Sequence, residues 1–482
     1  MDSLMSKILS EICRPQRRLS IISNPDGFLS RKDTIDAFSK EGYQVMMFTQ
    51  LQLRVWFETI FKDNPDGKFI VIMTYPDKVL ADILSEAFFA DFNARDLLLT
   101  YHQQTLDISN ITYAMMLSLY TTKGVSMKDK YSTESAVSEA KTKFGPDGED
   151  ISIVKQNLLS IVIDWNKPYD TINQISDYII KASKQGEYEE LEDEIEFINL
   201  SFQRHLDEVY YSQMITATGP RVVHKTLPYI ARTYSVGSKV ALVVVDGMAF
   251  WQYVLVRKAL VENGLETKEQ VSYSWLPSIT KLSRQSIFKG EYPERDYRQN
   301  PTNEKKLWYD YWQARNYTDF RIDYYHDEKP KNLDSIERLA IVDTGLDEFM
   351  HHASNMKLLY RETVDWVTTF INTIKGIHEQ GFEILLTSDH GSVFSHAWGN
   401  LSQHDRVQLY EDNSRGRRHL IFNNQMALQQ FIDRHTEEIE HLLIHGDYVI
   451  WRNNMCFGTE DKITHGGSHM LEMIVPFITI KK

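Results

Sequence analysis

The sequence predicts an α/β protein whose C-terminal part contains a central, mostly parallel sheet. Apolar runs alternate with helical segments over residues 18–100 and again from about residue 236, and this alternation is typical of parallel sheets. The residues between them show helical spacing instead. We therefore expect three parts: a small Rossmann-like α/β domain at 1–105, a helical domain at 106–225, and a large α/β domain at 226–482 with a cap-like insertion around 291–335.

The N-terminal domain is predicted from three apolar runs that end in turn residues. They are Leu19–Ile22, Tyr43–Phe48 and Lys68–Thr74. Between them, Lys32–Lys40 and Leu51–Phe61 carry apolar residues at helical spacing. Strands that alternate with helices in this way indicate a parallel sheet.

The middle of the chain carries few strand signals. Its apolar residues recur at helical spacing, as Ile175, Tyr178 and Ile179 illustrate. We therefore expect a helical domain there, which ends near Gly219 and Pro220.

Three apolar strands of the C-terminal domain each lead into acidic residues. They are Val240–Val245 before Asp246, Leu339–Val342 before Asp343 and Asp347, and Glu383–Thr387 before Asp389. Ligands collect at the carboxyl ends of strands in open α/β sheets, so these carboxylates would lie there together. Because they would repel one another without a cation between them, the pattern predicts a metal site.

The candidate ligands suffice for two metal ions. The chain has 2 cysteines, too few for a cysteine site, and zinc then prefers imidazole and carboxylate ligands, about four per ion. One ion would bind Asp246, Thr280, Asp389 and His390. The other would bind Asp347, His351 and His465, with a position left open for substrate or water. Two metals about 4 Å apart stabilise both the attacking and the leaving oxygen of a phosphoryl transfer.

Thr280 is the candidate nucleophile. Its hydroxyl is too weakly acidic to attack phosphorus unaided, and metal coordination would activate it. Pro277 and Ser278 predict that a helix begins here, and a helix N-terminus favours a bound phosphate. The alternative is that Ser278 or Thr280 only caps the helix. Beside the other candidate ligands, we favour the nucleophile.

Two histidine assignments leave an alternative open. His352 follows His351, although its direction on a helix would differ by about 100°. His469 competes with His465 in a glycine-rich segment. The spacing of Asp347 and His351 is also that of an ordinary side-chain pair on a helix.

The composition excludes several functional classes. The 482 residues contain 53 Lys+Arg and 67 Asp+Glu, a net charge of −14, which argues against a broad basic face for nucleic acid. No apolar run approaches the roughly 18 residues that span a bilayer, and the first residues lack the apolar core of a signal peptide. We therefore expect a soluble, cytoplasmic protein that does not contact membranes.

The order of these pieces resembles the PglZ domain of the alkaline phosphatase superfamily. The pieces are Asp-Gly after a strand, then LPSIT with an arginine four residues further on, D-E-x-x-H, S-D-H-G and H-G-G, over about residues 238–480. The resemblance implies an alkaline-phosphatase-like catalytic domain at 226–482 with a threonine or serine nucleophile. It also implies two divalent metal ions, usually zinc, with manganese or magnesium as alternatives. One ion would bind Asp246, Thr280, Asp389 and His390, and the other Asp347, His351 and His465.

The resemblance also implies a function. It predicts a metal-dependent phosphodiesterase or phosphohydrolase that acts on nucleotide or oligonucleotide phosphodiesters. Many PglZ proteins are encoded with bacterial phage-defence systems of the BREX type, so other BREX proteins are expected partners. The alternative from a different class is a scaffold or regulatory subunit of a defence complex, with a structural metal site. A mutase or transferase acting on a sugar phosphate would share the same metals.

Two further groups are candidates for binding substrate. Aromatic residues in the insertion would stack a nucleobase or form the insertion's own core, and we favour the core. Arginine binds phosphate oxygens bidentately. The candidate arginines are Arg284, four residues after Thr280, and the cluster Arg415, Arg417 and Arg418. A solvated loop explains that cluster equally well.

Overall fold

The computed structural model describes residues 2–73, 79–122, 124, 127–144, 151–216, 221–410 and 417–481. The chain packs into two compact units, Met1–Ile153 and Val154–Lys482, which are described separately. The expected helical stretch at 106–225 is shared between them. Its first helices belong to the first unit and its later ones to the second.

The first unit is a parallel α/β sheet with helices around it. Its strands occur in the order β2-β3-β1-β4, and all neighbouring pairs are parallel. They are β1 (Leu19–Ser23), β2 (Tyr43–Met47), β3 (Lys68–Ile72) and β4 (Ala87–Asp91). The helices are α1 (Ser3–Ile12), α2 (Lys32–Lys40), α3 (Gln50–Trp56), α4 (Ala81–Glu86), α5 (Tyr113–Thr122) and α6 (Lys130–Phe144), and α7 (Ile151–Leu159) crosses into the second unit. The three strands and two helices predicted here are confirmed, whereas β4 was not predicted.

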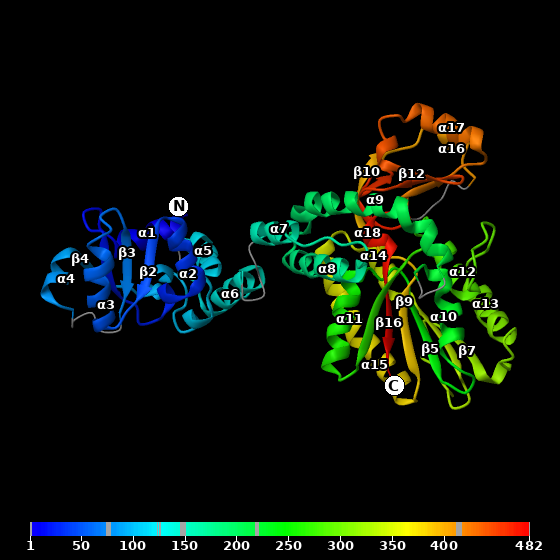
Figure 1. Cartoon of the computed structure of the whole chain (residues 1–482), viewed down its shortest axis with the longest axis horizontal. Coiled ribbons are helices and arrows are strands. Elements are labelled where there is room, and N and C mark those ends of the chain that lie inside the picture. The colour runs from blue at the N-terminus through cyan, green and yellow to red at the C-terminus, as the bar shows by residue number, and fades with distance from the viewer. Residues whose placement is uncertain are drawn as a thin grey trace. The chain divides into compact units, whose positions relative to one another are not determined.

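The second unit is built on a six-stranded sheet in the order β6-β16-β9-β5-β8-β7. Its strands are β5 (Val240–Val245), β6 (Thr267–Tyr273), β7 (Ile322–His326), β8 (Arg338–Asp343), β9 (Glu383–Ser388) and β16 (Ile474–Ile480). Five of the six strands run in the same direction, and β16 runs antiparallel to both of its neighbours, β6 and β9. Figure 1 shows β16, the last strand of the chain, lying within the sheet.

Helices cover both faces of this sheet (Figure 1). On one face α8 (Pro168–Gln185), α11 (Phe250–Glu262) and α15 (Met356–Glu379) pack on one another. On the other, α10 (Thr226–Thr233), α12 (Thr280–Lys289) and α13 (Pro301–Gln313) do so. The remaining helices are α9 (Glu192–Ile215), α14 (Gly345–His352), α16 (Gln403–Arg406), α17 (Gln425–Arg434) and α18 (Met470–Met473).

Two small sheets lie beyond the carboxyl end of the large one. One has the order β14-β10-β15 and the other β11-β13-β12. Their strands are β10 (Val393–Gly399), β11 (His419–Ile421), β12 (Leu442–His445), β13 (Tyr448–Trp451), β14 (Met455–Phe457) and β15 (Lys462–Thr464). The second sheet packs against α17 through its own apolar cluster, which includes Phe422, Phe431 and Trp451.

The register of the three central strands places the predicted carboxylates at one edge. Val245 pairs with Asp343 on one side and with Ser388 on the other, so β5, β8 and β9 end together. Asp246 and Asp389 are the next residues after β5 and β9. The strand ends predicted from the sequence therefore do meet at one place.

Strand β5 carries the core of this unit, because all six of its residues are buried between the helical layers. Replacing Leu242, whose side chain is 0% exposed, with alanine should lower the free energy of unfolding by about 2–5 kcal/mol. The control is Val261→Ala on α11, where the side chain is 64% exposed and the change should stay within about 0.5 kcal/mol. Urea unfolding of both variants measures the difference, and equal effects would contradict the placement of β5.

Candidate active site

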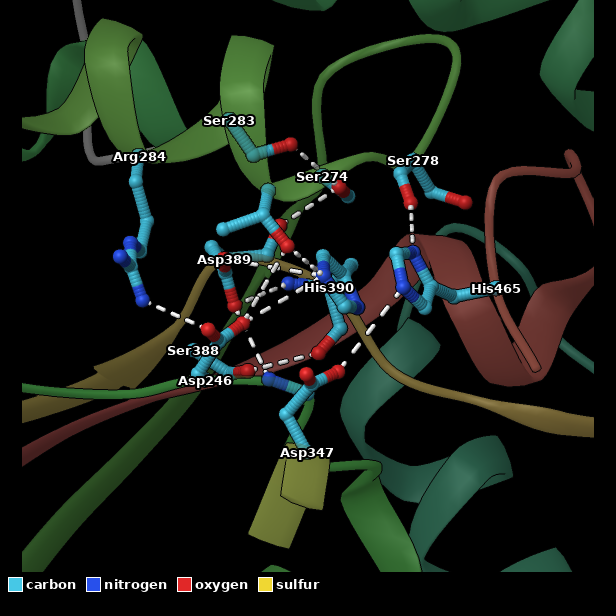
Figure 2. A network of polar contacts seen from close by, with 12 residues as sticks. Asp246, Ser274, Ser278, Ser283, Arg284, Asp347, Ser388, Asp389, His390 and His465 are labelled. Carbon is cyan, nitrogen blue, oxygen red and sulfur yellow. Dashed lines mark hydrogen bonds and ion pairs between the residues drawn. The ribbon is translucent and has the colours of Figure 1, made fainter. Parts of the chain in front are cut away.

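A cavity of about 450 Å³ opens at the carboxyl edge of the large sheet. Five of the seven candidate metal ligands line it: Asp246, Thr280, Asp347, His351 and His465. The other two, Asp389 and His390, are fully buried directly behind it. Figure 2 shows the side chains of Asp246, Asp347, Asp389, His390 and His465 turned toward one another. The structure thus brings together all seven candidates from five separate segments of the chain.

Thr280 is the first residue of α12, not a residue before it. The residue preceding the helix is Ile279, and no side chain caps the helix N-terminus. Ser278 is engaged elsewhere, since its hydroxyl donates to Gly467 O at 2.8 Å and accepts from Gly466 N at 3.1 Å. Neither Ser278 nor Thr280 is a cap, so the hydroxyl of Thr280 is left to face the cavity.

The Thr280 hydroxyl lies among acceptors. Its Oγ1 is 2.9 Å from His390 Nε2 and 3.4 Å from Asp246 Oδ1. His390 Nδ1 lies 3.0 Å from the carbonyl of Gly391, which can only accept, so Nδ1 carries the proton and Nε2 is the free acceptor. Thr280 therefore donates to His390.

Backbone contacts fix Asp389 with one oxygen left over. Its Oδ1 accepts from Gly247 N at 3.1 Å and from His390 N at 3.0 Å. Its Oδ2 is buried without a hydrogen-bond partner. Gly247 makes this approach with a φ of +68°, in the left-handed region that favours glycine.

A second turn supports the same segment. Ser388 Oγ lies within hydrogen-bond distance of the carbonyls of Val245 (2.8 Å) and His390 (2.7 Å), which ties the end of β9 to the end of β5. A side chain at Gly391 would place its Cβ 2.0 Å from the carbonyl oxygen of Leu471, so only glycine fits there. In the S-D-H-G motif, Ser388 and Gly391 thus hold the backbone tightly on either side of Asp389 and His390.

Asp347, His351 and His465 form the other half of the cluster. His351 Nε2 lies 3.4 Å from Asp347 Oδ2, and His465 Nε2 lies 3.8 Å from Asp347 Oδ1. His465 Nδ1 faces the carbonyl of Ser278 at 3.1 Å, which leaves its Nε2 free in the way that metal-binding histidines require. Asp347 Oδ1 is buried and has no hydrogen-bond partner.

These geometries fit cations. Two groups bring their ligand atoms within 4.8 Å of one another: Asp347, His351 and His465, and Asp246, Asp347 and His390. Buried carboxylate oxygens without partners, on Asp347 and Asp389, are costly unless a cation or a donor reaches them. Among these donors, the imidazoles suit zinc and the carboxylates suit manganese or magnesium.

Burial and mutual repulsion dominate the electrostatics of the carboxylates. Burial raises the pKa of Asp246, and Asp347 adds to this, while Arg284 opposes it. Burial and the charge of Asp246 raise the pKa of Asp389 well above its usual value. Burial alone would raise the pKa of Asp347 too, but the hydrogen bond with His351 and the charges of His465 and His390 lower it overall.

The choice between neighbouring histidines is clear in the structure. His351 faces Asp347, whereas His352 is exposed. His469 is buried away from the cavity, where its Nε2 lies 3.0 Å from Glu196 on α9 and its Nδ1 accepts from Leu471 N. Of these four histidines, His351 and His465 are the two that line the cavity.

The candidate arginines differ in where they lie. Arg284 lines the cavity, and its guanidinium is paired with Asp246 and Glu304. Arg418 is 0% exposed and donates to both oxygens of Glu472 at 2.8 Å, so it holds the segment after His465 in place. Arg417 is exposed outside the cavity lining. Arg415 lies outside the described residues.

The aromatic residues of the insertion mainly form its own core. Trp308 and Trp312 on α13 are each 1% exposed and stack edge to face, and Tyr324 on β7 is also buried. This confirms the interpretation that we favoured over nucleobase stacking.

Sequence analysis missed several residues that line the cavity. They are Lys281, Arg295, Gln299, His419 and Tyr448. Arg295 is held by Asp447 at 3.0 Å, and His419 and Tyr448 come from the small β11-β13-β12 sheet. Lys281 directly follows Thr280, so its position in the sequence could have indicated it. The other four belong to no motif, and only the fold brings β11 and β13 over the end of β5.

An α/β sheet with a carboxylate and histidine cluster at its carboxyl edge, beside a helix that begins with a threonine, defines an alkaline-phosphatase-like domain. Residues 229–480, more than half of the chain, match the BREX system PglZ alkaline phosphatase-like domain. The chain therefore belongs to the PglZ family, within the alkaline-phosphatase-like phosphoesterases. No curated protein matches it.

Two solved structures are similar to about half of the chain. Phosphonoacetate hydrolase from Sinorhizobium meliloti 1021, in complex with phosphonoformate, is 12% identical with a TM-score of 0.36, covering 51% of this chain and 90% of its own. Murine ectonucleotide pyrophosphatase/phosphodiesterase 5 is 12% identical with a TM-score of 0.39, covering 51% and 88%. Similarities this low support no inference about activity.

The buried histidines make the metal-free protein sensitive to acid. Burial lowers the pKa of His390 and of His465 to about 4, and His390 further lowers that of His465. Between pH about 6.5 and 4 the unfolded chain binds protons that the folded chain does not, so stability falls as pH falls through this window. Asp246 and Asp389 act in the opposite direction, because their pKa values are raised in the folded chain. The test therefore compares chelator-treated wild type with His465→Gln, which cannot titrate at this position. From pH 6.5 to 4 the melting temperature of wild type should fall relative to that of the variant, and a constant difference would contradict the burial of His465.

Proposed function

We propose that this protein is a metal-dependent phosphodiesterase of the PglZ type, with Thr280 as nucleophile and two divalent ions, zinc by preference, as cofactors. The observation that carries the proposal is the position of the Thr280 hydroxyl. It faces the cavity from a helix N-terminus, 2.9 Å from His390 Nε2, between two groups of residues that could each hold a cation. A weak nucleophile surrounded by ligands of this kind has little structural purpose.

The residues divide into two groups around Thr280. Asp246, Asp389 and His390 would hold one ion together with Thr280 Oγ1, and Asp347, His351 and His465 would hold the other. When bound, the two ions would supply the positive charge that lowers the pKa of the hydroxyl and stabilises the leaving oxygen.

The chain's own atoms account for the remaining chemistry. Thr280 Oγ1 forms a bond to phosphorus as the ester bond to the leaving alcohol breaks, which leaves a phosphorylated threonine. His390 Nε2 and Asp246 Oδ1 lie beside Oγ1 and would be occupied by the ion, so the hydroxyl proton is released to water. The leaving alkoxide takes up a proton from water. Water then attacks the same phosphorus and releases Thr280. The positive end of the α12 dipole, at Thr280, favours the phosphoryl oxygens during both steps.

The cavity supports a substrate larger than inorganic phosphate. Its volume of about 450 Å³ lies in the range of pockets that hold organic ligands, and its far wall carries Ile421, Tyr448 and His419. We propose nucleotide or oligonucleotide phosphodiesters as the substrate class. The family description supports a role in bacterial phage defence with other BREX proteins as partners. None of the helices within the described residues combines the length and apolar character that crossing a bilayer needs.

Thr280→Ala should abolish turnover of a chromogenic phosphodiester and leave the fold intact. We expect kcat to fall by about 10⁴-fold or more, the scale on which removing a nucleophile acts, while Thr280→Ser retains a measurable part of it. The assay compares both variants at saturating Zn²⁺ or Mn²⁺. Full activity of Thr280→Ala would exclude the nucleophile, and metal binding by a wild-type protein that turns over no phosphodiester would favour the scaffold alternative.

His351→Ala should weaken binding of one metal ion, because it removes a ligand from the group around Asp347. Loss of supporting residues around metals costs 10–100-fold in affinity, so loss of a ligand should cost at least about 100-fold. The matched control is His352→Ala, which removes an exposed imidazole one residue away. Calorimetric titration with Zn²⁺ measures both, and similar losses in the two variants would refute the assignment of His351.

A further inference from the structure

A buried arginine connects the candidate metal cluster to the insertion. Arg284 on α12 is 4% exposed. Its Nη1 donates to Asp246 Oδ2 at 2.6 Å, and its Nε donates to Glu304 Oε1 at 2.7 Å. Glu304, on α13 of the insertion, is 0% exposed. A chain of charge-assisted hydrogen bonds thus runs from the insertion to a residue of the cluster, and bonds of this kind are the strong ones.

The two oxygens of Asp246 have different partners. Oδ2 accepts the hydrogen bond from Arg284, while Oδ1 faces the cluster, 3.4 Å from Thr280 Oγ1 and 3.5 Å from His390 Nε2. With Arg284 in place, Asp246 can offer only one oxygen to a cation. The positive charge of Arg284 also weakens the pull of that carboxylate on a cation.

Two other residues of the insertion hold Glu304 in place. Tyr324 OH donates to Glu304 Oε2 at 2.6 Å, and Gln299 donates to Oε1. Among the described residues, Glu304 is the carboxylate that balances the charge of Arg284 on the side away from Asp246. Without it, Arg284 would have Asp246 as its one carboxylate partner.

We propose that Arg284 and Glu304 are positioning residues that set the metal affinity of the cluster, with Glu304 drawing the arginine back from Asp246. The proposal rests on the metal-dependent function proposed above. It replaces the expectation that Arg284 binds substrate, because two of its donor atoms already hold carboxylates in a buried position. It also gives the insertion a role in the chemistry, through one glutamate rather than through its aromatic residues.

The test is metal binding rather than turnover. Calorimetric titration of the full chain with Mn²⁺ and with Zn²⁺ compares wild type, Glu304→Gln and the double variant Arg284→Gln/Glu304→Gln. Glu304→Gln should bind metal about 10–100-fold more weakly, the range for residues that support ligands, because the unbalanced arginine then competes for Asp246. The double variant lacks the competing charge, so it should bind metal about ten-fold more tightly than Glu304→Gln does.

A control separates positioning from general support of the insertion. Tyr324→Phe removes a hydrogen bond from Glu304 but leaves its contact with Arg284, so its melting temperature should fall while its metal affinity stays within about two-fold. An equal loss of affinity in Tyr324→Phe and Glu304→Gln would overturn the proposal, as would wild-type affinity in Glu304→Gln or no recovery in the double variant.

If wild type binds no metal, the proposed function fails together with this inference. If wild type binds metal but Glu304→Gln is unchanged, the inference alone fails.

Discussion

The structure of the C-terminal unit depends on one electrostatic constraint: three carboxylates lie at the carboxyl edge of adjacent parallel strands. Burial raises the pKa of both Asp246 and Asp389, and the charge of Asp246 raises that of Asp389 further. Asp347 lies beside Asp246 on α14. Such a cluster is costly by itself, because burial removes the water that would stabilise the charges. Most of the local structure can be understood as the means of holding these groups in place with oxygens free for cations.

Short, rigid connections achieve this. Gly391 lies against the carbonyl of Leu471, where no side chain would fit. Gly247 donates its N–H to Asp389 from a backbone φ of +68°, which favours glycine. Ser278 and His465 join the start of α12 to the C-terminal segment. The buried pair of Arg418 and Glu472 fixes that segment from behind, since Glu472 also accepts from Gly467 N. The cluster is therefore assembled from distant parts of the chain but held by backbone contacts.

Much of this could be predicted from the sequence, for physical reasons. Strands such as Val240–Val245 are buried on both faces, so they appear as continuous apolar runs, and the residue that follows each one must lie at the sheet edge. Side-chain pairing could not be predicted in the same way. Arg284 pairs with Asp246, which lies 38 positions away in the sequence, and Arg418 pairs with Glu472, which lies 54 positions away. The sequence alone does not indicate such distant partners. β4 and β16 were missed for a similar reason, since their partners decide whether they join a sheet.

The most direct test of the central claim is a crystal structure of the zinc-loaded protein with anomalous diffraction data collected at the zinc edge. The account predicts two strong anomalous peaks in the cavity. One would lie among Asp246, Asp389, His390 and Thr280, and the other among Asp347, His351 and His465. Peaks elsewhere on the chain, or none at the end of β5, would contradict the claim that these carboxylates are gathered to hold metal ions.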